Sequence, residues 1–357
     1  MKFMKIIVLV LLLIGAQTAY GISAFDIRWG TDLISNQRSN TLKQWTESIE
    51  GRVTGSGGMG NHYYVDSGVV TEGDGTSWAD ARDTLDEAVA LCTADNGDVI
   101  HVRAGHTEDW TAADSADLDV AGITVIGEGQ GEARPLFTLD GAAAELVMGD
   151  ASIMITNLRF MASVDSTVHI IEVEDDADGF IIYNCEFMEP ESADTTDEAD
   201  DIIQVAAGAN QGFIVGNTFY SLSAGANTAI DLTAGVIEDI TVAYNYINGA
   251  FAEGAIFSDD IDLRCRIIGN TVIQLDAAMT PITFNTTATG IMEDNWCTSK
   301  STTYLIDAGS MHCKGNMWSD TDTADAAAVP MYTSETGVDI WAASQTTQIT
   351  TASTAAI

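Results

Sequence analysis

The chain has 357 residues, and its 53 acidic and 14 basic side chains give it a formal net charge of −39 at pH 7. A surface this acidic repels phosphate backbones, so the composition argues against a nucleic-acid partner. Solvation alone accounts for such a surface, and its carboxylates would also attract Ca²⁺, the only cofactor that the composition suggests. The length is sufficient for one elongated domain with a buried core.

Residues 1–21 have the pattern of a secretory signal peptide. Lys2 and Lys5 precede an uninterrupted apolar run from Ile6 to Ile14, and Ala19-Tyr20-Gly21 has the small residues of a cleavage site. The run is too short to cross a bilayer, and no later segment is apolar enough to do so. We therefore expect a secreted protein without a membrane span, with an uncleaved membrane anchor as the alternative.

Residues 22–60 are predicted to hold a short amphipathic helix and a flexible linker. Asn40 is a suitable cap for a helix over Thr41–Glu50, whose apolar residues fall on one face. A glycine-rich stretch over 55–60 follows the helix. The sequence leaves open whether this helix docks on the main domain, on a second copy of the chain or on a larger assembly.

Residues 61–320 are predicted to form the main domain, which begins with a strand over His62–Asp66 and a strand over Asp98–Val102. Between these strands, Asp80–Thr93 has the pattern of an amphipathic helix with one apolar face. We expect this N-terminal α-helix to cap the domain, because the open end of a stack of strands exposes unpaired edges.

A motif of an apolar run, an asparagine and another apolar residue occurs seven times between Ile153 and Trp318. The asparagines are Asn157, Asn184, Asn217, Asn245, Asn270, Asn295 and Asn316, separated by 27, 33, 28, 25, 25 and 21 residues. Repeats of this length indicate a solenoid, and the runs are too short and too rich in Ile, Val, Phe and Thr for helices. The sequence therefore predicts an all-β fold, a parallel β-helix, which the crossover rule makes right-handed.

The residue three positions before each asparagine is always apolar and is predicted to point into the core. These residues are Met154, Ile181, Ile214, Val242, Ile267, Met292 and Cys313. Because strand side chains alternate between faces, the columns two and four positions before the asparagine should point outward. The asparagines themselves are predicted to be structural: asparagine tolerates the left-handed backbone of a sharp bend, and stacked amides can hydrogen-bond from coil to coil.

Tyr64-Val65-Asp66 is followed by Gly73–Trp78, by Gly97–Val102 and by Gly105, and the asparagine coils then continue to Trp318. This order resembles the right-handed parallel β-helix proteins of the pectate-lyase-like superfamily, in which a strand and a helix plug the first coil. Such proteins include polysaccharide lyases, glycoside hydrolases, phage tailspikes and secreted proteins without known activity. The resemblance therefore implies the fold more strongly than a function. Cys92–Asp98 is especially similar to virion-associated β-helix proteins of marine phages.

Two of the outward columns are apolar in the first three asparagine coils. They contain Ile153, Ile155, Phe180, Ile182, Phe213 and Val215. An outward apolar stripe is unusual on a monomer surface. Two interpretations stay open: the excursion over 188–199 or the N-terminal helix covers the stripe, or the stripe is a subunit interface, as in a homotrimer.

The few basic residues of the second half of the chain gather in the last coils and are the candidates for chemistry. The candidates are the basic residues Arg264, Arg266, His312 and Lys314, together with the neighbouring Glu293. Such a basic island on an acidic protein could bind an anionic sugar, and a polysaccharide lyase needs a basic residue of this kind. Exposed ion pairs between coils, Asp239 with Arg264 and Glu293 with Lys314, are the competing interpretation.

Other residues suggest no further chemistry. The five cysteines are an odd number, so they cannot all pair within the chain, and we expect them to be small core residues. The acidic stretch Glu186–Asp201 is the best cation candidate by composition but lacks the spacing of a calcium loop, so we assign no metal site. Residues 321–357 are predicted to be a C-terminal cap and a frayed tail.

The polygalacturonase motifs of the superfamily are incomplete, because only a paired Asp-Asp occurs and no Gly-His-Gly does. We therefore expect a non-catalytic β-helix protein, secreted or on a virion surface, that binds a polysaccharide or cell-surface glycan or forms an assembly. A polysaccharide lyase or glycoside hydrolase that acts on an anionic polysaccharide is the alternative.

Overall fold

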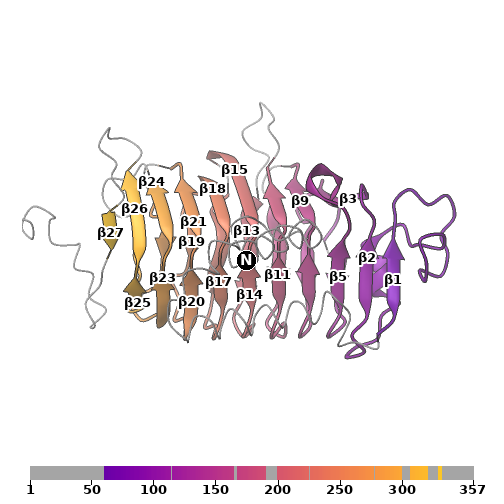
Figure 1. Cartoon of the computed structure of the whole chain (residues 1–357), viewed down its shortest axis with the longest axis horizontal. Helices are drawn as coiled ribbons and strands as arrows, with labels where there is room; N and C mark the ends of the chain where they lie inside the picture. Colours follow the sequence, from indigo (N-terminus) through magenta and orange to yellow (C-terminus); the bar gives the residue numbers. More distant parts are fainter. Residues whose placement is uncertain are drawn as a thin grey trace, which may run out of the picture. The chain divides into compact units, whose positions relative to one another are not determined.

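A computed structural model describes residues 60–331 except 114, 165–166, 190–198, 225, 277, 300–305 and 321–328. These residues form a parallel β-helix (Figure 1), so the predicted all-β fold is confirmed. The expected signal peptide (1–21), the helix predicted over Thr41–Glu50 and nearly all of the linker that follows it lie outside the described residues. No helix among the described residues is long and apolar enough to cross a membrane.

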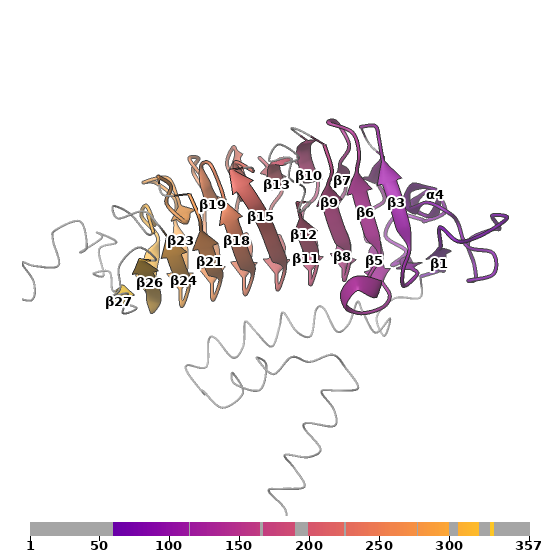
Figure 2. The same cartoon turned by 90° about the horizontal axis from the view of Figure 1, so that it is seen from above.

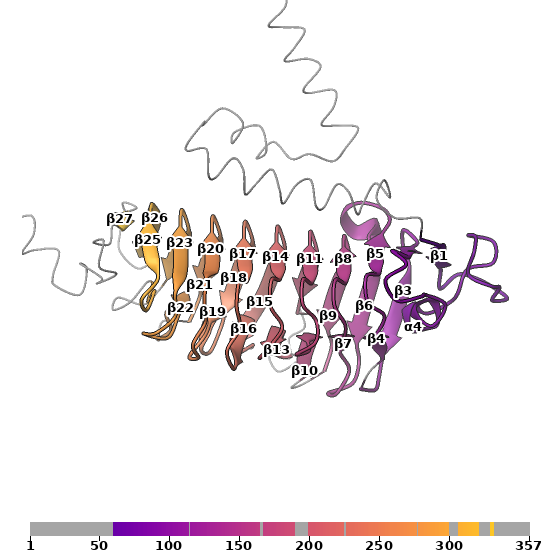
Figure 3. The ribbon, with the colours of Figure 1, turned by 90° about the horizontal axis from the view of Figure 1, so that it is seen from below.

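The strands belong to three sheets, which we call A, B and C. Along most of the chain, successive strands belong to different sheets. Sheet A contains β1 (His62–Val65), β2 (Val99–Val102), β5 (Thr124–Gly127), β8 (Met154–Thr156), β11 (Ile181–Tyr183), β14 (Phe213–Val215), β17 (Thr241–Ala243), β20 (Cys265–Ile268), β23 (Gly290–Glu293) and β25 (His312–Lys314). Sheet B, seen in Figure 2, contains β3 (Thr107–Trp110), β6 (Leu136–Leu139), β9 (Arg159–Ala162), β12 (Glu186–Met188), β15 (Thr218–Ala224), β18 (Tyr246–Ala250), β21 (Thr271–Gln274), β24 (Trp296–Ser299), β26 (Asn316–Asp320) and β27 (Val329–Met331). Sheet C, seen in Figure 3, contains β4 (Ala116–Leu118), β7 (Leu146–Met148), β10 (Thr167–Val173), β13 (Ala199–Ala206), β16 (Thr228–Ala234), β19 (Gly254–Phe257) and β22 (Ile282–Thr283).

Neighbouring strands pair in parallel throughout, except that β27 pairs antiparallel with β26. The inner face of sheet B carries a stack of aromatic rings. Ring centroids lie 5.7 Å apart between Phe137 and Phe160, 5.3 Å between Phe160 and Phe187, and 4.8 Å between Phe187 and Phe219. All four side chains are fully buried. Equivalent inward positions on successive coils thus place like residues on one another and fill the core.

Five of the seven asparagines form a continuous buried ladder along the β-helix axis. The Nδ2 of Asn217 donates to the Oδ1 of Asn245, and the same bond runs from Asn245 to Asn270, from Asn270 to Asn295 and from Asn295 to Asn316. These side chains are 0–1% exposed. Each Nδ2 also donates to a backbone carbonyl of the preceding coil, as Asn270 does to Val242. The ladder therefore satisfies the polar groups that the bend buries.

Asn157 and Asn184 occupy a different position in their coils. They adopt the left-handed backbone, with φ of 61° and 53°. In the later coils the left-handed residue comes one place earlier than the asparagine, for example Gly216 (φ 67°) before Asn217. The strand register agrees, because Tyr183 pairs with Val215, which sets Asn184 against Gly216. The left-handed role thus holds for two of the seven asparagines. The coil-to-coil role is not limited to the other five, because the Nδ2 of Asn184 also donates to the Oδ1 of Asn157, at 3.1 Å.

This offset of one residue corrects the prediction of which strand residues point inward. Ile155 and Ile182, rather than Met154 and Ile181, are in register with Ile214 in the core. The inward column of the later coils is as predicted, from Ile214 to Cys313. One extra residue between the second and third asparagines is enough to exchange the two faces of a strand.

The capping helix that was predicted over Asp80–Thr93 is shorter than this range. It is α4 (Leu85–Val89), five residues long, with Thr84 as its N-cap, and a 3-10 turn, η1 (Gly131–Ala133), follows later. Leu85, Ala88 and Val89 are buried and belong to the core, and α4 contacts strands β1, β2 and β4. Residues 76–82 form turns and an isolated bridge instead of helix.

Candidate functional site

The outer face of sheet B carries a band of uncharged side chains, which we call the aromatic strip. The strip consists of Thr218, Tyr220, Tyr246, Asn248, Thr271, Ile273, Trp296 and Thr298. These residues alternate with the buried inward column of β15, β18, β21 and β24, so their side chains point away from the core. Figure 2 shows these four strands side by side.

The rings of the strip lie where a ligand can reach them. Trp296 is 51% exposed, and Met317, the next residue in its column, is 36% exposed. The ring centroids of Tyr220 and Tyr246 are 6.0 Å apart, and the rings are tilted by 59°. Partial burial and the neighbouring Tyr246 raise the pKa of Tyr220, so its hydroxyl is protonated at neutral pH. The strip therefore offers apolar ring surface together with neutral hydrogen-bonding groups.

Charged residues flank the strip on the preceding coils, where they form ion pairs with one another. Glu186 follows Arg159 in the same outward column as Thr218. Both Arg134 and Arg159 form ion pairs with the carboxylate of Glu186. The two guanidinium groups are thus engaged by a carboxylate at this end of the strip.

The predicted basic island lies on the last strands of sheet A. The register sets Arg266 beside Ile291 and His312, and it sets Ile268 beside Glu293 and Lys314, so these outward columns are as predicted. His312 and Lys314 are exposed, whereas Arg266 and Glu293 are half-buried. The sheet thus brings four of the five candidates together on one face.

Arg264 belongs to a bend and not to this face. It has a left-handed backbone, with φ of 61°, and its guanidinium donates to both carboxylate oxygens of Asp239, at 3.0 and 2.8 Å, and to Glu238. Hydrogen bonds from Arg264 lower the pKa of Asp239, which therefore stays charged. Two carboxylates occupy this guanidinium, as the ion-pair interpretation requires.

The apolar residues proposed as a subunit interface are mostly core residues. Ile153, Ile155, Phe180 and Ile182 are fully buried and belong to the hydrophobic core, so the prediction that they point outward is wrong. The residues between them, such as Met154 and Ile181, face outward on sheet A. Met154 is 0% and Ile181 3% exposed, so this face is also shielded from solvent.

Phe213 and Val215, the last two interface candidates, do lie on the outer face of sheet A. Phe213 pairs with Ile181, and Val215 pairs with Tyr183, both of which are outward positions. Phe213 is half-buried, whereas Val215 is only 1% exposed. Their position is as predicted, but neither is an exposed apolar side chain.

The cysteines lack the environment of a catalytic thiol. All five are free; four are buried, and Cys92 is half-buried. Burial raises the pKa of Cys185 and of Cys265 to about 12, so both stay protonated and weakly nucleophilic at neutral pH.

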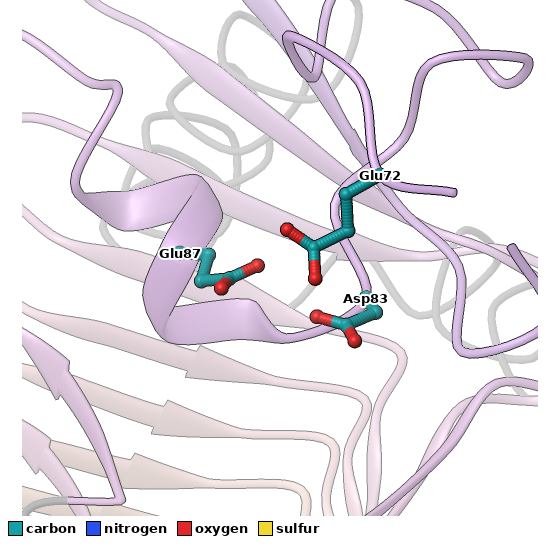
Figure 4. Close-up of side chains that lie close together, drawn as sticks. All are labelled: Glu72, Asp83 and Glu87. Atoms are coloured by element: carbon teal, nitrogen blue, oxygen red, sulfur yellow. The ribbon is translucent and has the colours of Figure 1, made fainter. Parts of the chain in front are cut away.

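One cluster of acidic side chains near α4 has the ligands of a cation site. Figure 4 shows the carboxylates of Glu72, Asp83 and Glu87 turned toward one another, and one oxygen from each lies within 4.8 Å of the others. Burial and the two neighbouring carboxylates raise the pKa of Glu87 to about 7. Protonation of Glu87 relieves the repulsion, and Arg82 lies 3.4 Å from Glu72, so we assign no metal here. Residues 190–198 of the acidic stretch lie outside the described residues.

Two aspartates, the buried Asp262 and the half-buried Asp201, have raised pKa values. Asp262 is 0% exposed, and burial raises its pKa to about 7, although the nearby Ser258 hydroxyl lowers it somewhat. Burial and the charge of Asp231 raise the pKa of Asp201 to about 7 as well. Asp201 accepts a hydrogen bond from Thr228 at 2.9 Å, and its carboxylate lies 4.0 Å from the Nδ1 of His169, whose pKa burial lowers.

These pKa values predict that the free energy of unfolding falls as the pH rises. A carboxyl whose pKa is about 4 unfolded and 7 folded binds a proton only in the folded state between these values, so its stabilising contribution is complete below pH 4 and lost through pH 7. We expect Asp262→Asn to raise the free energy of unfolding by ~2 kcal/mol at about pH 8 and to leave it nearly unchanged near pH 4. Urea unfolding at both pH values measures this difference. The control is Asp259→Asn, at an exposed position nearby in the chain. A destabilised Asp262→Asn at pH 8 would refute the raised pKa of Asp262.

Comparisons with known proteins add little to this geometry. No family model and no curated protein matches the sequence. Among solved structures, the chain is similar to a rhamnogalacturonan lyase, with 11% identity and a TM-score of 0.41 over 73% of this chain and 66% of that chain, slightly under two thirds of its length. It is also similar to a pectate lyase, with 14% identity and a TM-score of 0.40 over 76% of this chain and 79% of that chain. Such low identities concern the fold alone, and the pairing of the strands by itself shows a parallel β-helix.

Proposed function

We propose that the protein is a non-catalytic parallel β-helix that binds an extended, uncharged glycan along the aromatic strip. The observation that supports this proposal is the composition of the strip. Eight outward positions on four neighbouring strands include two tyrosines and an exposed tryptophan and no charged residue, in a chain with a net charge of −39. A band of partly exposed, uncharged side chains with an exposed tryptophan is suited to a binding surface.

The chemistry of the strip suits a sugar polymer. The apolar C–H faces of a sugar ring pack on aromatic rings, while its hydroxyls hydrogen-bond to side chains such as Thr271 and Asn248. Strands stack about 4.8 Å apart, so Tyr246 and Trp296, two coils apart in one column, are separated by about 10 Å. Regularly spaced contacts along one line can engage successive sugars of a single chain, and weak contacts then add up.

Binding to soluble polysaccharides tests this proposal. We expect the protein to bind a neutral polysaccharide such as xylan in affinity electrophoresis and to bind polygalacturonate more weakly, because its acidic surface repels a polyanion. Tyr246→Ala and Trp296→Ala should each weaken binding about tenfold, which corresponds to ~1.4 kcal/mol. Trp78→Ala, which removes a 37% exposed ring outside the strip, is the matched control. Equal binding by all three variants would refute the strip as the site.

Lyase activity on an anionic polysaccharide is the second candidate. The exposed His312 and Lys314, on the face that also carries Arg266, support it. If the protein is a lyase, polygalacturonate should yield unsaturated uronate products, and Lys314→Ala should abolish them. The engagement of Arg264 by Asp239 and Glu238 weakens this candidate, because that guanidinium is not available to a substrate.

The place of action is a proposal from the N-terminal sequence. The signal-peptide pattern over residues 1–21 supports a secreted protein, and a virion surface is the alternative. A homotrimer stays a prediction, and light scattering on the mature chain measures it.

A further inference from the structure

Two histidines meet at the N-terminal end of sheet A, on its outer face. His62 lies on β1 and His101 on β2, and these strands pair in parallel with Tyr64 opposite His101. His62 is two residues before Tyr64, so both imidazoles project from the same face of the sheet. The Nδ1 of His62 lies 2.9 Å from the Nε2 of His101. His62 is exposed and His101 half-buried, so an ion from solvent can reach both.

The ring of His101 is held in place on more than one side. Its Nδ1 lies 3.1 Å from the Oε1 of Glu128. The rings of His62 and Tyr64 both stack on it, with centroids 5.2 Å away and planes inclined by 18°. In the tautomer in which Nδ1–H of His101 donates a hydrogen bond to Glu128, the lone pair of His101 resides on Nε2, the nitrogen next to His62. A carboxylate that orients a histidine in this way is the usual outer partner of a metal-binding imidazole.

We propose that His62 and His101 bind one divalent transition-metal ion, with Glu128 as the residue that positions His101. Zinc lies about 2.0–2.1 Å from an imidazole nitrogen, so two nitrogens on one tetrahedral ion are about 3.3 Å apart. The present 2.9 Å separation needs to open by only a few tenths of an ångström. The ion replaces the proton that His62 shares with His101, and that proton leaves to solvent. Water completes the coordination.

The imidazole ligands determine which metal ions this site can bind. Imidazole nitrogen suits Zn²⁺, Ni²⁺ and Cu²⁺, and the general order of affinities places Cu²⁺ first. Ca²⁺ and Mg²⁺ prefer oxygen ligands and are expected at surface carboxylates instead. The site is therefore distinct in chemistry from the cluster of Glu72, Asp83 and Glu87.

Calorimetric titration of the full chain with Zn²⁺ tests the proposal, with excess Mg²⁺ present to occupy carboxylates. We expect the chain to bind one zinc ion. His62→Ala and His101→Ala should each weaken binding about tenfold or more, and Glu128→Gln should weaken it about tenfold through the orientation of His101. His312→Ala, an exposed histidine in the same outward column as His62 at the other end of the sheet, should bind as the unmodified protein does.

The thermal midpoint in the presence of a chelator provides a second readout. Because His62 is exposed, His62→Ala should unfold at the unmodified temperature with chelator and should lose the rise in midpoint that Zn²⁺ produces. The proposal is overturned if the double variant of His62 and His101 binds Zn²⁺ undiminished. It is also overturned if His312→Ala weakens binding as much as His62→Ala does.

Discussion

Asn270→Ala is expected to destabilise the protein by about 3 to 6 kcal/mol, because the substitution interrupts the buried ladder at its centre. The Oδ1 of Asn270 accepts from the backbone N–H and the Nδ2 of Asn245, and its Nδ2 donates to Val242 and Asn295. Alanine removes these four hydrogen bonds in a region where Asn270 itself is 0% exposed. Urea unfolding, followed by circular dichroism, measures the change.

Asn248→Ala is the matched control for this prediction. Asn248 lies in the adjacent coil but on the outer, half-buried face of sheet B, so its loss should cost less than ~1 kcal/mol. If the two variants unfold at the same urea concentration, the ladder does not stabilise the β-helix. A typical domain is stable by only about 5–15 kcal/mol, so loss of the ladder at one coil is a large fraction of the total.

Phe187→Ala is expected to cost about 3 to 5 kcal/mol, because it leaves a cavity in the middle of the aromatic stack. The Phe187 ring lies between those of Phe160 and Phe219, at 5.3 and 4.8 Å, and all three are fully buried. Coils on both sides are held by the strand ladders, so the cavity can close only partly. The free energy of unfolding from urea titration tests this value.

Phe257→Ala, on the outer face of sheet C, provides the comparison. Phe257 is half-buried and pairs with Asp231 and Thr283, so its truncation should cost about 1 kcal/mol and leave no closed cavity. A Phe187→Ala variant no less stable than Phe257→Ala would show that the stack is loosely packed. Phe187→Leu, which refills most of the volume, should recover part of the loss.

The repeats made the fold predictable, because a motif near 25 residues long can bury its apolar face only against its neighbours. The repeats could not specify the strand register between the coil of Asn184 and the coil of Asn217. Asn184 and Asn217 look equivalent in sequence. In the structure Asn184 itself has the left-handed backbone, whereas Asn217 comes directly after the left-handed Gly216. Alignment of the repeats on their asparagines predicts that Ile153 and Phe180 lie on the surface. In the structure both residues belong to the hydrophobic core.

The aromatic strip lies outside the columns before each asparagine, from which the candidate residues were predicted. The residues one and three positions after it, such as Tyr246 and Asn248 after Asn245, alternate with the buried column and form the outer face of sheet B. Their uncharged, aromatic composition was a signal present in the sequence. The His62–His101 pair carried no such signal, because these residues are 39 positions apart and only the pairing of β1 with β2 brings them together.

Hydroxyl-radical footprinting with bound xylan, read out by mass spectrometry, tests most directly whether the strip binds glycan. We predict protection of Tyr220, Tyr246, Trp296 and Met317 from oxidation, and unchanged oxidation of His312, which lies on the outer face of sheet A. Protection at His312 with the strip still oxidised, accompanied by shortening of the polysaccharide, would contradict a non-catalytic glycan-binding strip and point to the basic island.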